Sequence, residues 1–171
     1  MVKYCVGVLM VAAALVPMAR AATLPAPENQ RPAAAAQAVG AVHTLRQIPE
    51  ACARLQGSFT GDAAQPYRFE VVRTSPQCQP RARMVPFATA KPSQQAGWIL
   101  SDLIRVPSAA CPQQQAVVQV WRLPVDNAGK RDGQGQSRIY LEDAKKQAAS
   151  GQVAKVPQFT ATMDVEGRCT A

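Results

Sequence analysis

Four cysteines follow the first 21 residues of this chain, and they constrain its fold more than any other feature. They are Cys52, Cys78, Cys111 and Cys169, so that no two lie close together in the sequence. An even number of cysteines in an exported protein indicates a disulfide framework, because compartments outside the cytoplasm are oxidising. Zinc ligands usually come in close pairs. We therefore expect two disulfides, and neither a metal site nor a cofactor.

Export is predicted by the start of the chain. Lys3 supplies a positive charge, residues 6–16 form an unbroken run of apolar or small residues, and residues 19–21 match a small-x-small cleavage pattern. The apolar run is too short to span a bilayer, which takes roughly 17–25 residues. We expect a signal peptide over residues 1–21, cleavage near Ala21, and a soluble mature protein without a transmembrane segment, located in the periplasm or secreted.

The remaining roughly 150 residues are enough for one domain with a hydrophobic core. Residues 22–44 are rich in Ala and Pro, and they are predicted to form a flexible or partly helical arm. Pro32 suits the first position of a helix, and the alanines after it favour helix over residues 33–45. Residues 45–171 are predicted to form a single disulfide-crosslinked domain.

Apolar and polar residues alternate through much of that domain, which is typical of half-buried β-strands. A first hairpin is expected over residues 53–59 and 67–72, followed by a short strand near residues 81–84. A second hairpin, residues 98–106 and 116–123, is apolar on both faces and so is expected to be buried on both. A last strand is expected over residues 158–166. Residues 126–137 are predicted to be an exposed loop, and residues 143–150 a helix.

These elements predict a mainly β fold, with α+β as the alternative. The expected architecture is a small twisted antiparallel sheet, as a sandwich or half-barrel, with one short helix. Folding the first hairpin about residue 63 brings Cys52 near Cys78. If the strands at residues 116–123 and 158–166 are antiparallel neighbours, Cys111 meets Cys169. The predicted disulfides are therefore Cys52–Cys78 and Cys111–Cys169.

The chain carries a formal net charge of +8, which favours contact with anionic partners. The alternating pattern places arginines on the polar faces of the first three strands, and we take these as candidate binding residues: Arg54, Arg68, Arg81 and Arg83. The loop over residues 126–137 is a second candidate contact region. A solvated face without a partner explains the same charges, and no nucleic-acid-binding motif accompanies them.

Catalytic motifs are absent from the sequence. The one histidine, His43, has no nucleophile motif beside it. Asp102 is the one candidate acid, because it interrupts the apolar face formed by Trp98, Leu100 and Ile104; burial there favours a general acid. The alternative is a structural ion pair with Arg105 or Arg122. The aromatic residues are expected either to stack a ligand or to pack in the core: Tyr67, Trp98, Trp121 and Tyr140.

Three hypotheses about function follow. The first is a non-enzymatic binding or inhibitor-like domain of the cell envelope, recognising a protein or an anionic glycan or lipid. The second is a small hydrolase that depends on Asp102. The third is a structural or assembly factor of the envelope that uses residues 22–42 as a tether. The sequence predicts no oligomeric state.

Overall fold

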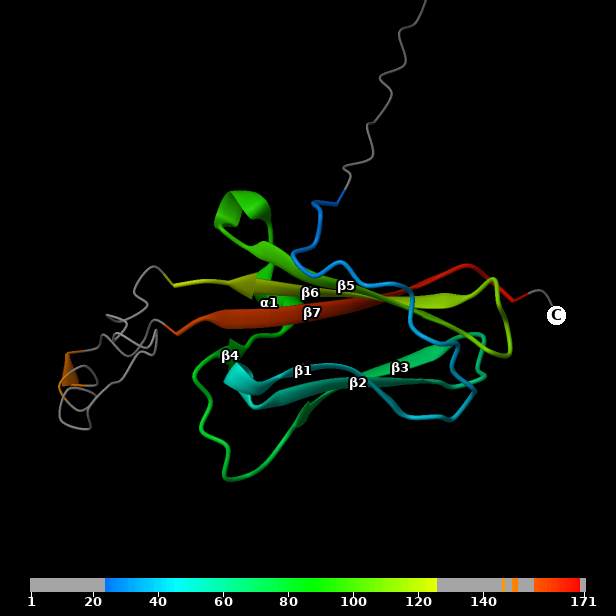
Figure 1. Cartoon of the computed structure of the whole chain (residues 1–171), viewed down its shortest axis with the longest axis horizontal. Coiled ribbons are helices and arrows are strands. Elements are labelled where there is room, and N and C mark those ends of the chain that lie inside the picture. Colours follow the sequence, from blue (N-terminus) through cyan, green and yellow to red (C-terminus); the bar gives the residue numbers. More distant parts are fainter. Residues whose placement is uncertain (1–23, 126–145, 147–148, 151–155, 170–171) are drawn as a thin grey trace, which may run out of the picture.

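Two β-sheets lie face to face in the computed structural model (Figure 1), which describes residues 24–125, 146, 149–150 and 156–169. The three-stranded sheet has the order β1-β2-β3, and the four-stranded sheet has the order β4-β7-β6-β5. The strands are β1 (His43–Ile48), β2 (Ala53–Phe59), β3 (Tyr67–Arg73), β4 (Arg83–Met84), β5 (Ile99–Pro107), β6 (Gln115–Leu123) and β7 (Gln158–Glu166). The structure confirms the predicted mainly β fold in its sandwich form.

The first predicted hairpin is β2 and β3, which pair antiparallel from Ala53 with Arg73 to Phe59 with Tyr67. Along β2 the side chains alternate between buried and half-buried positions, because successive residues of a strand point to opposite faces. Leu55 and Phe59 face the four-stranded sheet and are buried. The residues that alternate with them lie on the outer face of the three-stranded sheet, namely Arg54, Gln56 and Ser58.

The second predicted hairpin is β5 and β6, and β7 pairs antiparallel with β6 on the other side. β4 adds two residues to this sheet, parallel to β7. On β6, Val117 and Val118 point to opposite faces and both are buried. The four-stranded sheet is thus covered on both faces, as its apolar sequence predicts.

The main hydrophobic core fills the space between the sheets. Both sheets contribute its buried side chains: Leu45, Ile48, Ala53, Leu55, Phe59, Tyr67, Ala82, Ile104, Val106, Ala116, Val118, Val120 and Phe159. A second, smaller cluster lies on the outer face of the four-stranded sheet, where Trp98, Leu100 and Trp121 pack together. Ala90, at the end of the short helix α1 (Phe87–Ala90), packs against this second cluster.

The segment before β1 differs from its prediction. The described residues 24–42 contain no helix. They run instead beside the free edge of β5, in parallel, with bridges from Asn29 to Asp102 and from Gln37 to Ser108. Backbone hydrogen bonds of 2.9–3.0 Å join this arm to the carbonyl groups of β5. The prediction of a helix over residues 33–45 is wrong. The extended arm hydrogen-bonds to the carbonyl groups at the edge of β5, and the strand β1 already begins at His43.

The helical elements are short. α1 and the 3-10 turn η2 (Gln94–Ala96) lie between β4 and β5, and the 3-10 turn η1 (Pro49–Ala51) connects β1 to β2. The predicted helix over residues 143–150 lies mostly outside the described residues, as do the predicted signal peptide and the predicted loop over residues 126–137.

Both predicted disulfides are present, Cys52–Cys78 and Cys111–Cys169, each with Cα atoms 5.8 Å apart. The first closes the open end of the β2–β3 hairpin. The second joins the loop before β6 to the residues after β7. Each sheet therefore carries one covalent crosslink at one of its ends.

Candidate functional site

The outer face of the three-stranded sheet is the broadest polar surface that the strand register defines. We call it the outer arginine face. Side chains from all three strands form it, since the register aligns them in rows: Thr44, Gln47, Arg54, Gln56, Ser58, Arg68, Glu70 and Val72. Its side chains are half-buried on the central strand β2 and, apart from Val72, exposed on β1 and β3.

The candidate arginines are only partly brought together. Arg54 lies on β2 and Arg68 on β3, and both point to the outer arginine face. Arg81 lies at the end of the sheet, where its backbone N–H donates to the Glu50 carbonyl at 2.6 Å. Arg83 lies on β4, in the other sheet, opposite Gln158 of β7. The outer arginine face therefore contains two of the four candidates.

All four candidate arginines share one electrostatic property. Among the described residues the ion pairs use other arginines, namely Arg31, Arg46, Arg105 and Arg122. No carboxylate of the described chain lies within ion-pair distance of the four candidates. Arg54 is half-buried, with its Nε atom lacking a hydrogen-bond partner; the other three are exposed. Their charge is not used within the described fold.

Two residues of the outer arginine face were missed by the sequence analysis. Thr44 lies on β1 within the predicted arm and helix, and Gln47 lies on β1 in a part of the domain for which the sequence predicts no element. A β-bulge between Thr44 and Arg46 breaks the alternation of this strand, so its sequence lacks a period of two. A strand with a bulge this near its start gives no clean pattern to detect.

Asp102 faces the space between the two sheets, and not the face that the sequence predicted. A second bulge shifts the β5–β6 register between Leu100, opposite Trp121, and Asp102, opposite Val120. Because Trp121 and Val120 are neighbours on one strand, they point to opposite faces. Trp98 and Leu100 thus belong to the outer cluster, whereas Asp102 and Ile104 point inward.

The carboxylate of Asp102 is fully buried and pairs with two arginines. Its Oδ2 atom accepts from Arg46 Nη1 at 2.8 Å and lies 2.9 Å from Arg31 Nε. Its Oδ1 atom has no hydrogen-bond partner among the described residues. Arg46 comes from β1 and Arg31 from the arm, so one buried carboxylate joins both sheets and the arm. The structural ion pair is confirmed, with partners other than the predicted Arg105 and Arg122.

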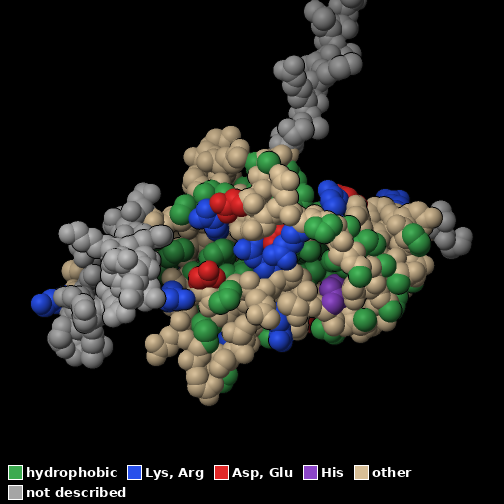
Figure 2. Space-filling model, in the orientation of Figure 1, with side chains coloured by type: hydrophobic (Ala, Val, Ile, Leu, Met, Phe, Trp, Pro, Cys, Tyr) green, Lys and Arg blue, Asp and Glu red, His purple; other side chains and the backbone are tan. Residues whose placement is uncertain are grey.

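Arg105 and Arg122 have acidic partners of their own. Arg105 Nη1 lies 2.8 Å from Glu166 Oε2 on the exposed surface. Arg122 donates through Nε to Glu28 Oε2 at 2.6 Å and through Nη2 to Glu28 Oε1 at 2.5 Å. The hydrogen bond from Arg122 holds the pKa of Glu28 below its usual value. Figure 2 shows basic and acidic side chains side by side at the level between the two sheets.

The aromatic residues form no exposed stacking surface in the described part. Trp98 and Trp121 are buried in the outer cluster, and Tyr67 is buried in the main core. Tyr140 lies outside the described residues. The Tyr67 ring crosses over Gly57, where an added Cβ would come within 2.2 Å of its oxygen. The Tyr67 hydroxyl and His43 Nε2 share a hydrogen bond of 2.6 Å, and burial raises the pKa of Tyr67.

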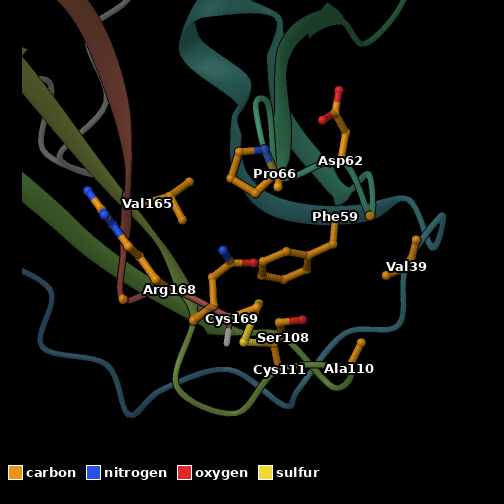
Figure 3. Close-up of a pocket in the computed structure, with 14 residues that line it drawn as sticks. Val39, Phe59, Asp62, Pro66, Ser108, Ala110, Cys111, Val165, Arg168 and Cys169 are labelled. Atoms are coloured by element: carbon orange, nitrogen blue, oxygen red, sulfur yellow. A yellow bond between two sulfur atoms is a disulfide. The ribbon is translucent and has the colours of Figure 1, made fainter. Parts of the chain in front are cut away.

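A cavity of about 650 Å³ opens at one end of the sandwich. The Phe59 ring, Pro66, Val165 and the Cys111–Cys169 disulfide form much of its wall (Figure 3). Asp62 and Arg168 lie on its sides, with charged ends directed away from Phe59 (Figure 3). His43 and Asp102 are not among the lining residues. This arrangement offers a hollow lined by both polar and apolar groups, without a paired acid and base among the described residues.

Among the residues that the structure describes, no three His, Cys, Asp or Glu side chains lie close enough together to hold a metal ion. No helix among these residues is long and apolar enough to cross a bilayer.

Comparison with known proteins gives no family for this chain. No protein-family model, no curated protein and no solved structure matches it.

Proposed function

We propose that this chain is a non-enzymatic binding domain, acting in the periplasm or the medium, which recognises an anionic partner through its outer arginine face. The observation that carries the proposal is the contrast between paired and unpaired arginines. Four arginines of the described chain have carboxylate partners. Arg54 and Arg68 have none among the described residues, although they lie on one face of the same sheet.

The chemistry of the guanidinium group supports an anionic ligand. Arginine presents a planar fork of N–H donors that matches the oxygen atoms of carboxylates, sulfates and phosphates. The polar groups around the two arginines, Gln47, Gln56 and Ser58, add hydrogen-bond donors and acceptors at fixed positions of a sheet. A rigid strand platform loses little conformational entropy when it binds, which favours affinity.

The alternative of a hydrolase has less support. Asp102 is fully buried between two arginines, and no described acid donates a hydrogen bond to its free oxygen Oδ1. Glu70 on β3 points to the opposite side of the three-stranded sheet. The tether function also has less support, because the described part of the arm is hydrogen-bonded along β5.

The proposal is tested by measuring binding of the oxidised chain to two anionic probes, a sulfated polysaccharide and vesicles containing an anionic phospholipid. The variant Arg54→Gln/Arg68→Gln is compared with the matched variant Arg81→Gln/Arg83→Gln, which removes the same charge away from the face. We expect the first variant to lose about tenfold or more in affinity and the second to lose much less. Binding of the unchanged chain is expected to weaken steeply with salt.

Equal losses in both double variants would mean that net charge alone drives binding, and would overturn the role of the face. Binding that is insensitive to salt would remove the electrostatic basis of the proposal altogether.

A further inference from the structure

The edges of the two sheets are protected to different extents. β5 is covered by the arm through backbone hydrogen bonds. β4 has two residues and is followed closely by Pro86. β1 carries a bulge between Thr44 and Arg46. Coverage, shortness and bulges are the devices that prevent edge strands from pairing with other chains.

β3 has none of these protections within the described chain. It is a seven-residue strand, Tyr67–Arg73, with an unbroken register against β2. It contains no proline, and no bridge reaches its other side from a described residue. Val71, near its middle, is 48% exposed. A regular edge with an exposed β-branched residue is a surface suited to strand addition.

The direction of the backbone groups follows from the hairpin. Thr60 N–H donates to the Pro66 carbonyl, and Thr74 N–H donates to the Cys52 carbonyl. Hydrogen-bonded positions alternate along an antiparallel ladder. Arg68, Glu70 and Val72 therefore face β2 with their backbone groups, and the alternate residues of β3 present theirs to the free edge.

The sequence of β3 is complementary to itself in one antiparallel register. A two-fold axis at Phe69 places each Phe69 opposite the other and Tyr67 opposite Val71 of the second copy. All of these residues present their backbone groups to the edge, so they form hydrogen-bonded pairs. The same register places Arg68 opposite Glu70 of the second copy, twice by symmetry, in the non-hydrogen-bonded positions where side chains lie closest.

The neighbouring symmetric registers lack this complementarity. An axis at Glu70 places two carboxylates opposite each other, which is destabilising. An axis at Val71 places Glu70 opposite Val72 of the second copy, so that no carboxylate lies opposite Arg68.

We propose that the unprotected edge of β3 binds β3 of a second copy of this chain, antiparallel about Phe69, so that the two three-stranded sheets form one continuous sheet. A two-fold contact of this kind closes on itself and stops at the dimer. The inference goes beyond the binding function proposed above and does not require it, since self-association is measured without a ligand. Arg68 takes part in both, so a variant that changes the edge but keeps both arginines is needed.

Val71→Pro is that variant. The Val71 N–H faces the free edge and not β2, so proline removes a donor of the dimer and no hydrogen bond of the hairpin. Sedimentation velocity of the disulfide-bonded chain over a range of concentrations measures the association. We expect a concentration-dependent dimer for the unchanged chain, and a monomer for Val71→Pro with both disulfides. The thermal unfolding midpoints of the two are expected to agree at concentrations where the unchanged chain is monomeric.

Charge reversals test the register. Arg68→Glu, or Glu70→Arg, turns both cross-strand pairs into like-charge pairs and is expected to weaken the dimer by about tenfold or more. The double variant Arg68→Glu/Glu70→Arg restores both pairs and is expected to recover the dimer. Their partners on β2 are the uncharged Ser58 and Gln56, so the reversals break no ion pair within the monomer. Arg81→Glu is the matched control, because Arg81 is exposed and lies outside β3.

The proposal is overturned by a chain that stays monomeric at every concentration, even if an extended peptide of another protein binds this edge. It is also overturned if Val71→Pro folds and dimerises as the unchanged chain does. Loss of the dimer in both single reversals without recovery in the double variant would exclude the register. The reversals decide the question alone if Val71→Pro does not fold.

Discussion

The two sheets of this sandwich differ in how much of their surface the chain itself covers. The four-stranded sheet has α1 and a tryptophan cluster on its outer face and the arm along its β5 edge. The three-stranded sheet has an outer face of exposed and half-buried side chains, and it has the free edge of β3. The covering segments of the four-stranded sheet serve its folding and stability. Another molecule could contact the outer face or the β3 edge of the three-stranded sheet without displacing any described part of the chain.

The difference can be seen in the sequences of the strands. β5 and β6 carry apolar residues at both even and odd positions, as expected for strands buried on two faces. β2 alternates between buried residues and polar ones, as expected for a strand with one solvated face. The hydrophobic core between the sheets contains one polar joint, the buried pairing of Asp102 with Arg46 and Arg31.

The largest expected effect comes from breaking that joint. Asp102→Asn keeps the shape of the side chain but leaves Arg46, whose side chain is 17% exposed, without its carboxylate. Removing one member of a buried ion pair costs about 3–5 kcal/mol. We expect a loss of this size in the free energy of unfolding by denaturant, and faster amide exchange at Glu28 and Asn29 of the arm.

Glu166→Gln is the control for this variant, because the Arg105–Glu166 pair is exposed on both sides. Exposed pairs contribute roughly 0–1 kcal/mol. If Asp102→Asn costs no more than Glu166→Gln, the ion pair does not join the sheets.

Removing a disulfide is expected to give the next largest effect. Each disulfide belongs to one sheet, so the two removals test the sheets one at a time. Replacing Cys111 and Cys169 by serine removes a crosslink over 58 residues, and replacing Cys52 and Cys78 removes one over 26. The chain-entropy model predicts losses of about 4 and about 3.5 kcal/mol. Denaturant unfolding measures both, and amide exchange shows which sheet opens. A reversed order would show that strain or residual structure outweighs loop length.

A smaller effect tests the inner face of the three-stranded sheet against its outer face. Gly57→Ala places a methyl group where the Tyr67 ring lies, so the ring must move and its hydrogen bond with His43 is disturbed. Overpacking of this kind costs about 1–3 kcal/mol. Ser58→Ala, one residue away on the outer face, is expected to change stability by less than about 0.5 kcal/mol. Thermal unfolding of the two variants makes the comparison.

The smallest effect depends on pH and concerns the arm. Because Arg122 lowers the pKa of Glu28 below its ordinary value of 4.5, the carboxylate stabilises the folded state above that value. This contribution is lost as the pH falls through the lowered pKa of the folded state. The pair is partly exposed, so we expect less than about 1 kcal/mol. Amide exchange of the arm, taken relative to the intrinsic exchange rate at each pH, should rise in acid, and Glu28→Gln should abolish that part of the change.

Predictions from the sequence succeeded where the feature depends on a single strand or on one pair of neighbouring strands. The alternation in residues 53–59 and 158–166 identified β2 and β7, and the placing of Cys111 and Cys169 beside two neighbouring strands identified a disulfide. They failed at Asp102 and at β1, where bulges change which face a residue occupies. They also failed for the arm, whose alanines favour helix although the edge of β5 holds it extended.

The sequence by itself determined the alternation of the strands, the spacing of the four cysteines after residue 21 and the excess of arginine. Each depends on residue types within one segment of chain. Only the tertiary structure decided which arginines find a carboxylate, which edge stays uncovered and where Asp102 points. Those outcomes depend on the register between strands distant in the sequence, and a shift of one residue in that register exchanges the two faces of a strand.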